Sequence, residues 1–189
     1  CLMMDHGQVK LIGPTDEVIK TYLDECGQPH ADYTFSNERK ADVDFERIWL
    51  TAPDGESLAE VDVLKPFRIN FTVVVSQPRQ DVDFGIWLRT IRNVPVCMPC
   101  GSDSNEGRIR GLQKGKYNCF FEVPGNFLVP DSYKITIWSH VPNVAGVAYH
   151  EDVVSFTVIE TGSTMRYCDA PWRYGCVFGH FPLEFSKID

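Results

Sequence analysis

The stretch from Asp42 to about Glu160 consists of short runs in which apolar and polar residues alternate, and this pattern restricts the fold more than any other feature. In the run 67–75 apolar side chains fall on every second position, the period of a strand with one buried face. Turn residues such as Pro53-Asp54-Gly55 separate the runs. The expected strands are 43–51, 67–75, 82–88, 94–98, 117–123, one beginning at Tyr133, and 154–158. Such strands without intervening helices predict an all-β fold, an immunoglobulin-like antiparallel β-sandwich.

Two local signals add detail to this sandwich. Pro95 lies inside the run 94–98 and cannot donate a ladder hydrogen bond, so this run is expected at a sheet edge. Tyr133 follows the turn Pro130-Asp131-Ser132 and starts a strand, as the tyrosine of a tyrosine corner does in immunoglobulin-like sandwiches.

The segment before the sandwich has a different pattern. Gln8 to Ile12 reads as a short strand, and Pro14 precedes a helical stripe formed by Val18, Ile19, Tyr22, Leu23 and Cys26. One strand and one helix cannot bury a core alone. The chain also opens with Cys1 in place of Met, and we expect it to be a piece of a longer protein. Residues 28–41 are polar without a period and are expected to form a linker.

The segment after the sandwich, residues 161–189, is rich in aromatic side chains: Tyr167, Trp172, Tyr174, Phe178, Phe181 and Phe185. A disordered tail lacks such residues, so this tail is expected to pack on its own sheet or on a partner. Residues 173–178 are the part expected to form an added strand.

Net charge and cysteine content restrict the kinds of ligand and chemistry expected for this chain. The net charge is −8, and Lys and Arg are scattered, which argues against binding to a phosphate backbone. Seven cysteines form no disulfide framework. Cys97 and Cys100 form the one suggestive pair, but a zinc site needs a second pair, and a redox site needs a helix after the motif. Reduced thiols are the interpretation we favour.

No catalytic motif emerges. The segment 111–117 has the wrong spacing for a nucleotide-binding loop, and no Gly-x-Ser-x-Gly elbow occurs. The five histidines are dispersed. Asp83 and Glu122 are the acids that fall on outer strand faces, and we expect them on opposite sheets, too far apart for a glycosidase pair. The chain is therefore not expected to be an enzyme.

Three parts of the chain carry a resemblance to a known family. They are the opening, with DHGQV at 5–9 and GPTDEVI at 13–19, the middle, with FGIWLR at 84–89 and FEVP at 121–124, and the tail, with YGCVF at 174–178. The opening resembles the last strand and helix of an ABC ATPase domain, the middle resembles the sandwich appended to some of these subunits, and the tail fits its end. Together the three parts resemble the C-terminal region of the Wzt-type ATP-binding subunits of ABC transporters.

Wzt-type subunits drive export of O-antigen polysaccharide across the inner membrane of Gram-negative bacteria, and their appended domain is a dimeric module that recognises this polysaccharide. The resemblance implies four parts: the end of an ATPase domain (1–27), a linker (28–41), a carbohydrate-binding sandwich (42–160) and an aromatic tail, added or exchanged as a strand (161–189).

The same resemblance implies the partners. These are the O-antigen polysaccharide, a second copy in a homodimer, and the transporter's membrane subunit, reached through the ATPase domain on the cytoplasmic side; nucleic acid is not among them. The phosphate-binding loop, signature motif and catalytic carboxylate lie outside this chain. ATP and Mg²⁺ are therefore expected only for the intact subunit, and no cofactor is expected for this chain.

A sugar-binding face should carry exposed aromatic rings among hydrogen-bonding groups. Since Phe84, Ile86 and Leu88 are expected to point inward, Trp87 and Arg89 point outward, and on the neighbouring strand the outward side chains include Thr136, Trp138 and His140. These five form the first candidate carbohydrate-binding face: Trp87, Arg89, Thr136, Trp138 and His140. A second candidate face on the other sheet consists of Asn70, Phe120 and Glu122.

Two alternatives remain open at this point. The tail or a second subunit could cover the first face. The domain could also be a module that dimerises or docks the transporter without touching glycan.

Overall fold

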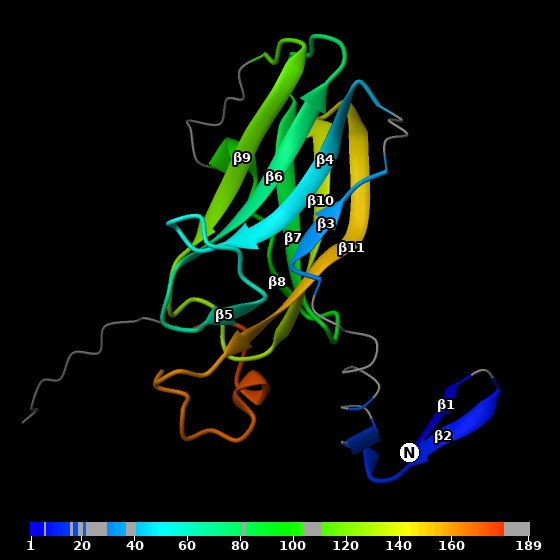
Figure 1. Ribbon diagram of the computed structural model, residues 1–189, viewed down its shortest axis with the longest axis vertical. Coiled ribbons are helices and arrows are strands. Elements are labelled where there is room, and N and C mark those ends of the chain that lie inside the picture. The colour runs from blue at the N-terminus through cyan, green and yellow to red at the C-terminus, as the bar shows by residue number, and fades with distance from the viewer. Residues whose placement is uncertain are drawn as a thin grey trace, which may run out of the picture.

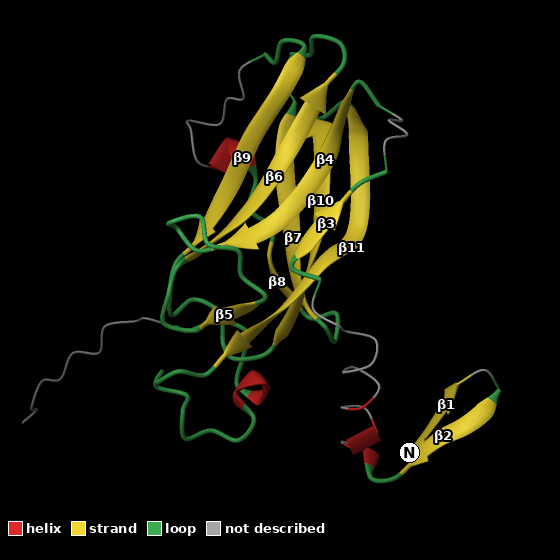
Figure 2. Cartoon of the chain, viewed as in Figure 1, coloured by secondary structure: helices red, strands yellow, loops and turns green. Residues whose placement is uncertain are grey.

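The computed structural model describes residues 1–5, 7–15, 17–18, 21, 30–36, 41–80, 82–103 and 111–179. Nine of the described strands form two stacked sheets, which appear as two layers in Figure 1. Loops and short 3₁₀ turns connect the strands (Figure 2). The predicted all-β, immunoglobulin-like antiparallel sandwich is therefore confirmed.

One layer is a five-stranded sheet. Its order is β5 (Glu60–Asp62), β11 (Ala145–Ile159), β10 (Ser132–Val141), β7 (Asp83–Thr90) and β8 (Pro95–Cys97). All neighbours are antiparallel except β5 and β11, which run parallel. β8, which contains Pro95, lies at the edge as predicted, where a missing backbone donor costs least.

The other layer is a four-stranded antiparallel sheet in the order β3 (Asp32–Thr34), β4 (Val43–Thr51), β6 (Phe67–Val75) and β9 (Gly115–Val123). β3 falls inside the segment expected to be a linker. It is three exposed residues long and pairs only along part of β4, so it leaves no periodic signal in the sequence.

The core fills the space between the layers. Ile69 and Phe71 of β6 face it from one sheet, and Ile86, Ile135 and Ile137 face it from the other. Each of these five side chains is at least 98 % buried. The alternating apolar positions of the sequence thus produce one continuous core, because both sheets turn their apolar faces toward each other.

The predicted tyrosine corner is present. The buried Tyr133 hydroxyl donates to the carbonyl of Val129 at 2.6 Å, and burial raises the pKa of this phenol far above its ordinary value. The same hydroxyl lies 3.1 Å from the carbonyl of Cys176 in the tail. The corner therefore ties the start of β10 to the C-terminal segment.

The tail lies against the turn that precedes β10. Val177 forms a bridge with Leu128, and the Phe178 amide donates to Phe127 at 2.9 Å. A short 3₁₀ turn, η2 (Pro171–Arg173), comes before this contact. Phe181 and Phe185 lie outside the described residues.

At the N-terminus, β1 (Leu2–Asp5) pairs with the predicted strand β2 (Gln8–Ile12) in a separate two-stranded sheet. Thr15, Glu17, Val18 and Thr21 have helical backbone. The rest of the predicted stripe (Ile19, Tyr22, Leu23 and Cys26) lies outside the described residues.

Candidate binding faces of the sandwich

β7 and β10 are neighbours in one sheet, as the sequence predicted. Their register sets Trp87 opposite Thr136, Arg89 opposite Lys134, and Gly85 opposite Trp138. Because Phe84, Ile86 and Leu88 of β7 all enter the core, the intervening side chains point to the outer face. The structure therefore gathers the five residues of the first face on one surface.

The expectation that all five are exposed is wrong. Thr136 is fully buried, Arg89 is 8 % exposed and Trp138 is 9 % exposed, whereas Trp87 and His140 are half-buried. Strand phase determines which side of the sheet a residue occupies, but neighbouring side chains on that side determine how much solvent reaches it.

Trp138 is buried because its indole lies flat over Gly85. A Cβ atom at position 85 would stand 2.0 Å from Cζ2 of this indole, so only glycine fits beneath the ring. The His140 ring stacks on the same indole with a centroid separation of 4.7 Å and an interplanar angle of 9°. Sequence reasoning missed Gly85, although a glycine inside a strand pattern indicates a close approach.

Arg89 and Thr136 are buried by an ion network with β11. The Arg89 guanidinium lies 4.4 Å from the centre of the Trp87 ring and donates to Asp152 at 2.5 Å and to Glu151 at 3.1 Å. The Lys134 ammonium donates to the other Asp152 oxygen at 2.6 Å. Two cations therefore share one carboxylate on this face.

Asp152 occupies a bulge in β11, where its backbone adopts a left-handed φ of 51°. This conformation turns its amide toward Thr136, whose hydroxyl accepts a hydrogen bond at 3.1 Å. Burial alone would raise the pKa of Asp152, but Lys134 and Arg89 outweigh it and lower this pKa below its ordinary value. The sequence predicted the last strand only from Val154 onward, so Glu151 and Asp152 were missed.

Tyr149 completes this face. It pairs with Trp138 across β11 and β10 and is 57 % exposed. The surface reached by solvent thus combines Tyr149 with the half-buried rings of Trp87 and His140, next to the charges of Glu151 and Asp152.

The second candidate face lies on the outer side of the four-stranded sheet. Asn70 pairs with Phe120 on β9 and with Trp49 on β4, and Phe120 is 53 % exposed. Glu122 accepts a hydrogen bond from Arg68 at 2.8 Å. Asp83 and Glu122 lie on different sheets, as predicted. Trp49 and its neighbour Arg47 were missed, although their alternation with Ile48 and Leu50 marks them as outward.

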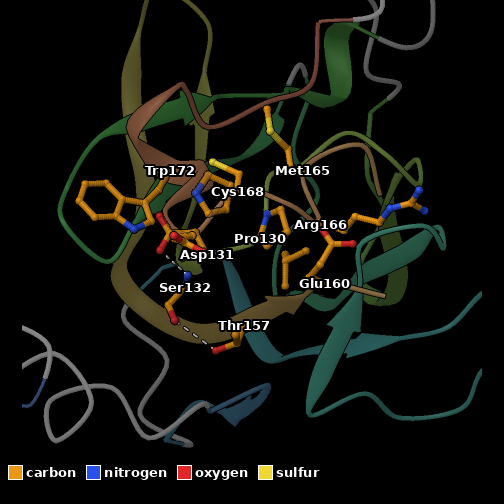
Figure 3. A pocket seen from close by; sticks show the side chains of 12 residues that line it. Pro130, Asp131, Ser132, Thr157, Glu160, Met165, Arg166, Cys168 and Trp172 are labelled. Atoms are coloured by element: carbon orange, nitrogen blue, oxygen red, sulfur yellow. Dashed lines mark hydrogen bonds between the residues drawn. The ribbon is translucent and has the colours of Figure 1, made fainter. Parts of the chain in front are cut away.

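The sandwich also has hollows at its margins. One of about 470 Å³ lies between the tail and the start of β10 (Figure 3). There Asp131 pairs with Arg92 at 2.5 Å, and Trp172 stacks on the same guanidinium at 4.2 Å. Burial raises the pKa of Asp131. Asp131 and Trp172 of this hollow are thus both engaged with Arg92.

A second hollow of about 330 Å³ opens between β4 and β11, and its lining residues include Tyr33, Phe35, Phe45 and Tyr149. His150 and Asp44 contact each other there at 3.1 Å between Nε2 and Oδ1.

The described residues contain no cluster of His, Cys, Asp and Glu that could hold a metal ion. Burial raises the pKa of the Cys97 thiol, and burial with the charges of Asp103 and Asp83 raises that of Cys100. Both shifts favour the protonated thiol over the reactive thiolate. Among the described residues, no helix has the length and apolarity to cross a membrane.

Comparison with known proteins rests on structure, because no family model and no curated protein matches this sequence. A crystal structure of the C-terminal domain of Wzt superimposes with a TM-score of 0.62. The match covers 85 % of this chain and 92 % of that one, at 12 % sequence identity. The sandwich has the fold of the Wzt C-terminal domain.

Agreement with other solved structures is weaker. A CARDB domain of the PF1109 protein from Pyrococcus furiosus, in complex with di-metal ions, gives a TM-score of 0.36 at 14 % identity, covering 67 % of this chain and 95 % of that one. An alkylpurine DNA glycosylase from Pseudomonas fluorescens gives 0.37 at 12 % identity, covering 66 % and 32 %.

Proposed function

We propose that this domain recognises an O-antigen-type polysaccharide and so selects cargo for an ABC exporter. The observation that carries the proposal is the outer face of β7, β10 and β11, where Trp87, His140 and Tyr149 stand beside a hydrogen-bonding charge network. Sugar rings offer C–H faces to aromatic side chains and hydroxyls to carboxylates and cations. The fold of the Wzt C-terminal domain supports the same assignment.

The residues of this face divide into two roles. Trp87, His140 and Tyr149 retain exposed surface and would contact the sugar. Trp138, Thr136 and Arg89 are buried beneath or beside them and would hold the contacting groups in place. Preorganised side chains lose little conformational freedom on binding, which favours affinity for a polar ligand.

The wider setting follows from the same proposal. The chain itself performs no chemistry; ATP and Mg²⁺ would act in an ATPase domain joined to it, at the cytoplasmic side of the inner membrane. The module would work as a homodimer beside the transporter's membrane subunit.

The test is a titration of tryptophan fluorescence with the O-polysaccharide of the source strain. Trp87→Ala removes a half-buried ring without opening the core and should weaken binding about fivefold or more. Trp172→Ala is the matched control, since Trp172 is 41 % exposed but lies in the tail. Equal affinity of wild type and Trp87→Ala would remove this face from the proposal.

The alternative is a module that dimerises or docks the transporter without binding glycan. It predicts no saturable change at millimolar polysaccharide, together with an intact dimer. The same titration therefore separates the two functions.

A further inference from the structure

The outer face of the four-stranded sheet carries one continuous row of side chains that crosses all its strands. Asp32 of β3 pairs with Trp49 of β4, Trp49 pairs with Asn70 of β6, and Asn70 pairs with Phe120 of β9. Figure 1 shows these four strands side by side in one layer. Since adjacent strands are about 4.8 Å apart, the two aromatic residues stand about 10 Å apart, with an amide between them.

Each ring of this row is held by an arginine. The Arg47 guanidinium lies 4.7 Å from the centre of the Trp49 ring, and that of Arg68 lies 4.5 Å from the centre of the Phe120 ring. Phe120 nevertheless leaves 53 % of its surface to solvent. The arginines therefore fix the rings and leave aromatic surface open for a ligand.

The amides between and beside the rings have unused hydrogen-bonding capacity. Asn70 donates through Nδ2 to the Thr51 hydroxyl at 3.0 Å. No described residue donates a hydrogen bond to its Oδ1. Asn118 accepts from the Thr72 hydroxyl at 3.1 Å through Oδ1, which leaves its Nδ2 without an acceptor among the described residues. The face thus offers one acceptor and one donor, the pair that a sugar hydroxyl can use.

The charges on this face are balanced. Arg47 pairs with Asp32, Arg68 with Glu122 at 2.8 Å, and Lys116 with Glu46 at 2.6 Å. The hydrogen bond from Arg47 lowers the pKa of Asp32, which keeps this carboxylate ionised in its pair. A phosphate backbone needs surplus positive charge, and a protein interface is built around a contiguous apolar centre; this face has neither. Balanced charge with separated rings and amides fits a neutral hydroxylated polymer.

We propose that this face, which we call the Trp49–Phe120 platform, is a second polysaccharide site. It binds sugars in the interior of the polysaccharide and not at its end. An extended pyranose chain advances by about one strand spacing per ring, so sugars on Trp49 and Phe120 would have one sugar between them, above Asn70. The row ends at both sheet edges, β3 and β9, and so a polymer can continue past it in either direction. The inference rests on the proposed polysaccharide recognition and adds a site on the opposite side of the sandwich.

The experiment measures calorimetric binding of O-polysaccharide fragments of increasing length to the full chain. We expect Phe120→Ala to lower affinity about fivefold for fragments of three sugars or more, and Phe120→Tyr, which keeps the ring, to restore it. Trp87→Ala is the matched variant on the other sheet, and combining it with Phe120→Ala should reduce binding further than either alone. Unchanged thermal melting would show that Phe120→Ala remains folded.

The failures are distinguishable. If the wild-type chain binds no fragment, polysaccharide recognition itself is wrong, and the platform with it. If the wild type binds and Trp87→Ala weakens binding, but Phe120→Ala and Trp49→Ala both bind as the wild type does, the platform alone is overturned.

Discussion

Gly85 and Trp138 form a single packing unit on the outer surface of the five-stranded sheet. The indole occupies the space that any side chain at position 85 would need, since a Cβ there would come within 2.0 Å of it. The glycine is therefore required by packing and not by backbone conformation. The stacked His140 ring depends on the same arrangement.

We expect Gly85→Ala to displace the indole, lower the free energy of unfolding by about 1–3 kcal/mol and change tryptophan fluorescence in the native state. Gly146→Ala on β11 is the control, because a Cβ there meets nothing within 4 Å. Urea unfolding of both variants checks this. Equal midpoints would mean that the ring is not held against position 85.

Tyr133 joins the start of β10 to both the preceding turn and the tail through one hydroxyl. Removing that hydroxyl in Tyr133→Phe leaves the buried carbonyl of Val129 without this donor and should cost about 1–3 kcal/mol. Tyr149→Phe removes an exposed hydroxyl and should leave stability unchanged. Thermal melting of the two variants provides the comparison, and equal losses would contradict a special role for the corner.

The outward phase of Trp87 and Arg89 was predictable from the alternation along β7 alone. Their degree of burial was not, because it depends on Glu151 and Asp152 of β11, more than sixty positions along the chain. The second face shows the same limit: Phe120 and Asn70 were placed on it, whereas their pairing through one row with Trp49 depends on strand register. Register is set by tertiary packing and leaves no local signal.

β11 carries a bulge between His150 and Val154, where its register against β10 shifts. The bulge places the Asp152 carboxylate within reach of Lys134 on β10 and Arg89 on β7, so one side chain links three strands. Bulges redirect side chains in this way in many sheets. This bulge therefore shapes the first candidate face.

Asp152→Asn tests this link, since asparagine also tolerates a left-handed backbone. The ion pairs lower the pKa of Asp152 in the folded state, so their stabilisation is complete above the unfolded pKa near 3.8 and disappears as the pH falls through the folded pKa. The variant should be about 1–2 kcal/mol less stable at pH 7. The difference should vanish at low pH; denaturation curves that differ equally at pH 7 and below pH 3 would argue against the ion pairs.

The longer strands were predictable because alternation over seven or more residues is a strong signal. β3 and β5 were missed because each has three residues, too few for a period. The first half of β11 was missed because His150, Glu151 and Asp152 interrupt its apolar pattern. β5 pairs in parallel with β11, which lies far along the chain. Local sequence does not encode such a pairing.

In the single chain, the tail packs on residues 127–129 and on the tyrosine corner. The same contacts can form between two copies, since exchange of a terminal segment preserves them. We predict a homodimer in solution that depends on the tail. Light scattering of the full chain and of a form ending at Glu160 checks this: a monomeric full chain refutes the dimer, and a dimeric truncated form moves the interface elsewhere.

The function proposed for this sandwich depends on whether it binds polysaccharide at all. Calorimetric titration of the intact chain with O-polysaccharide from the source strain measures this directly, with an unrelated neutral glucan as the comparison. We predict saturable binding to the O-polysaccharide with a dissociation constant below about 1 mM. Binding to the glucan should be weaker by about tenfold or more. No heat of binding to the O-polysaccharide at millimolar sugar would contradict the central claim and leave a docking or dimerisation module in its place.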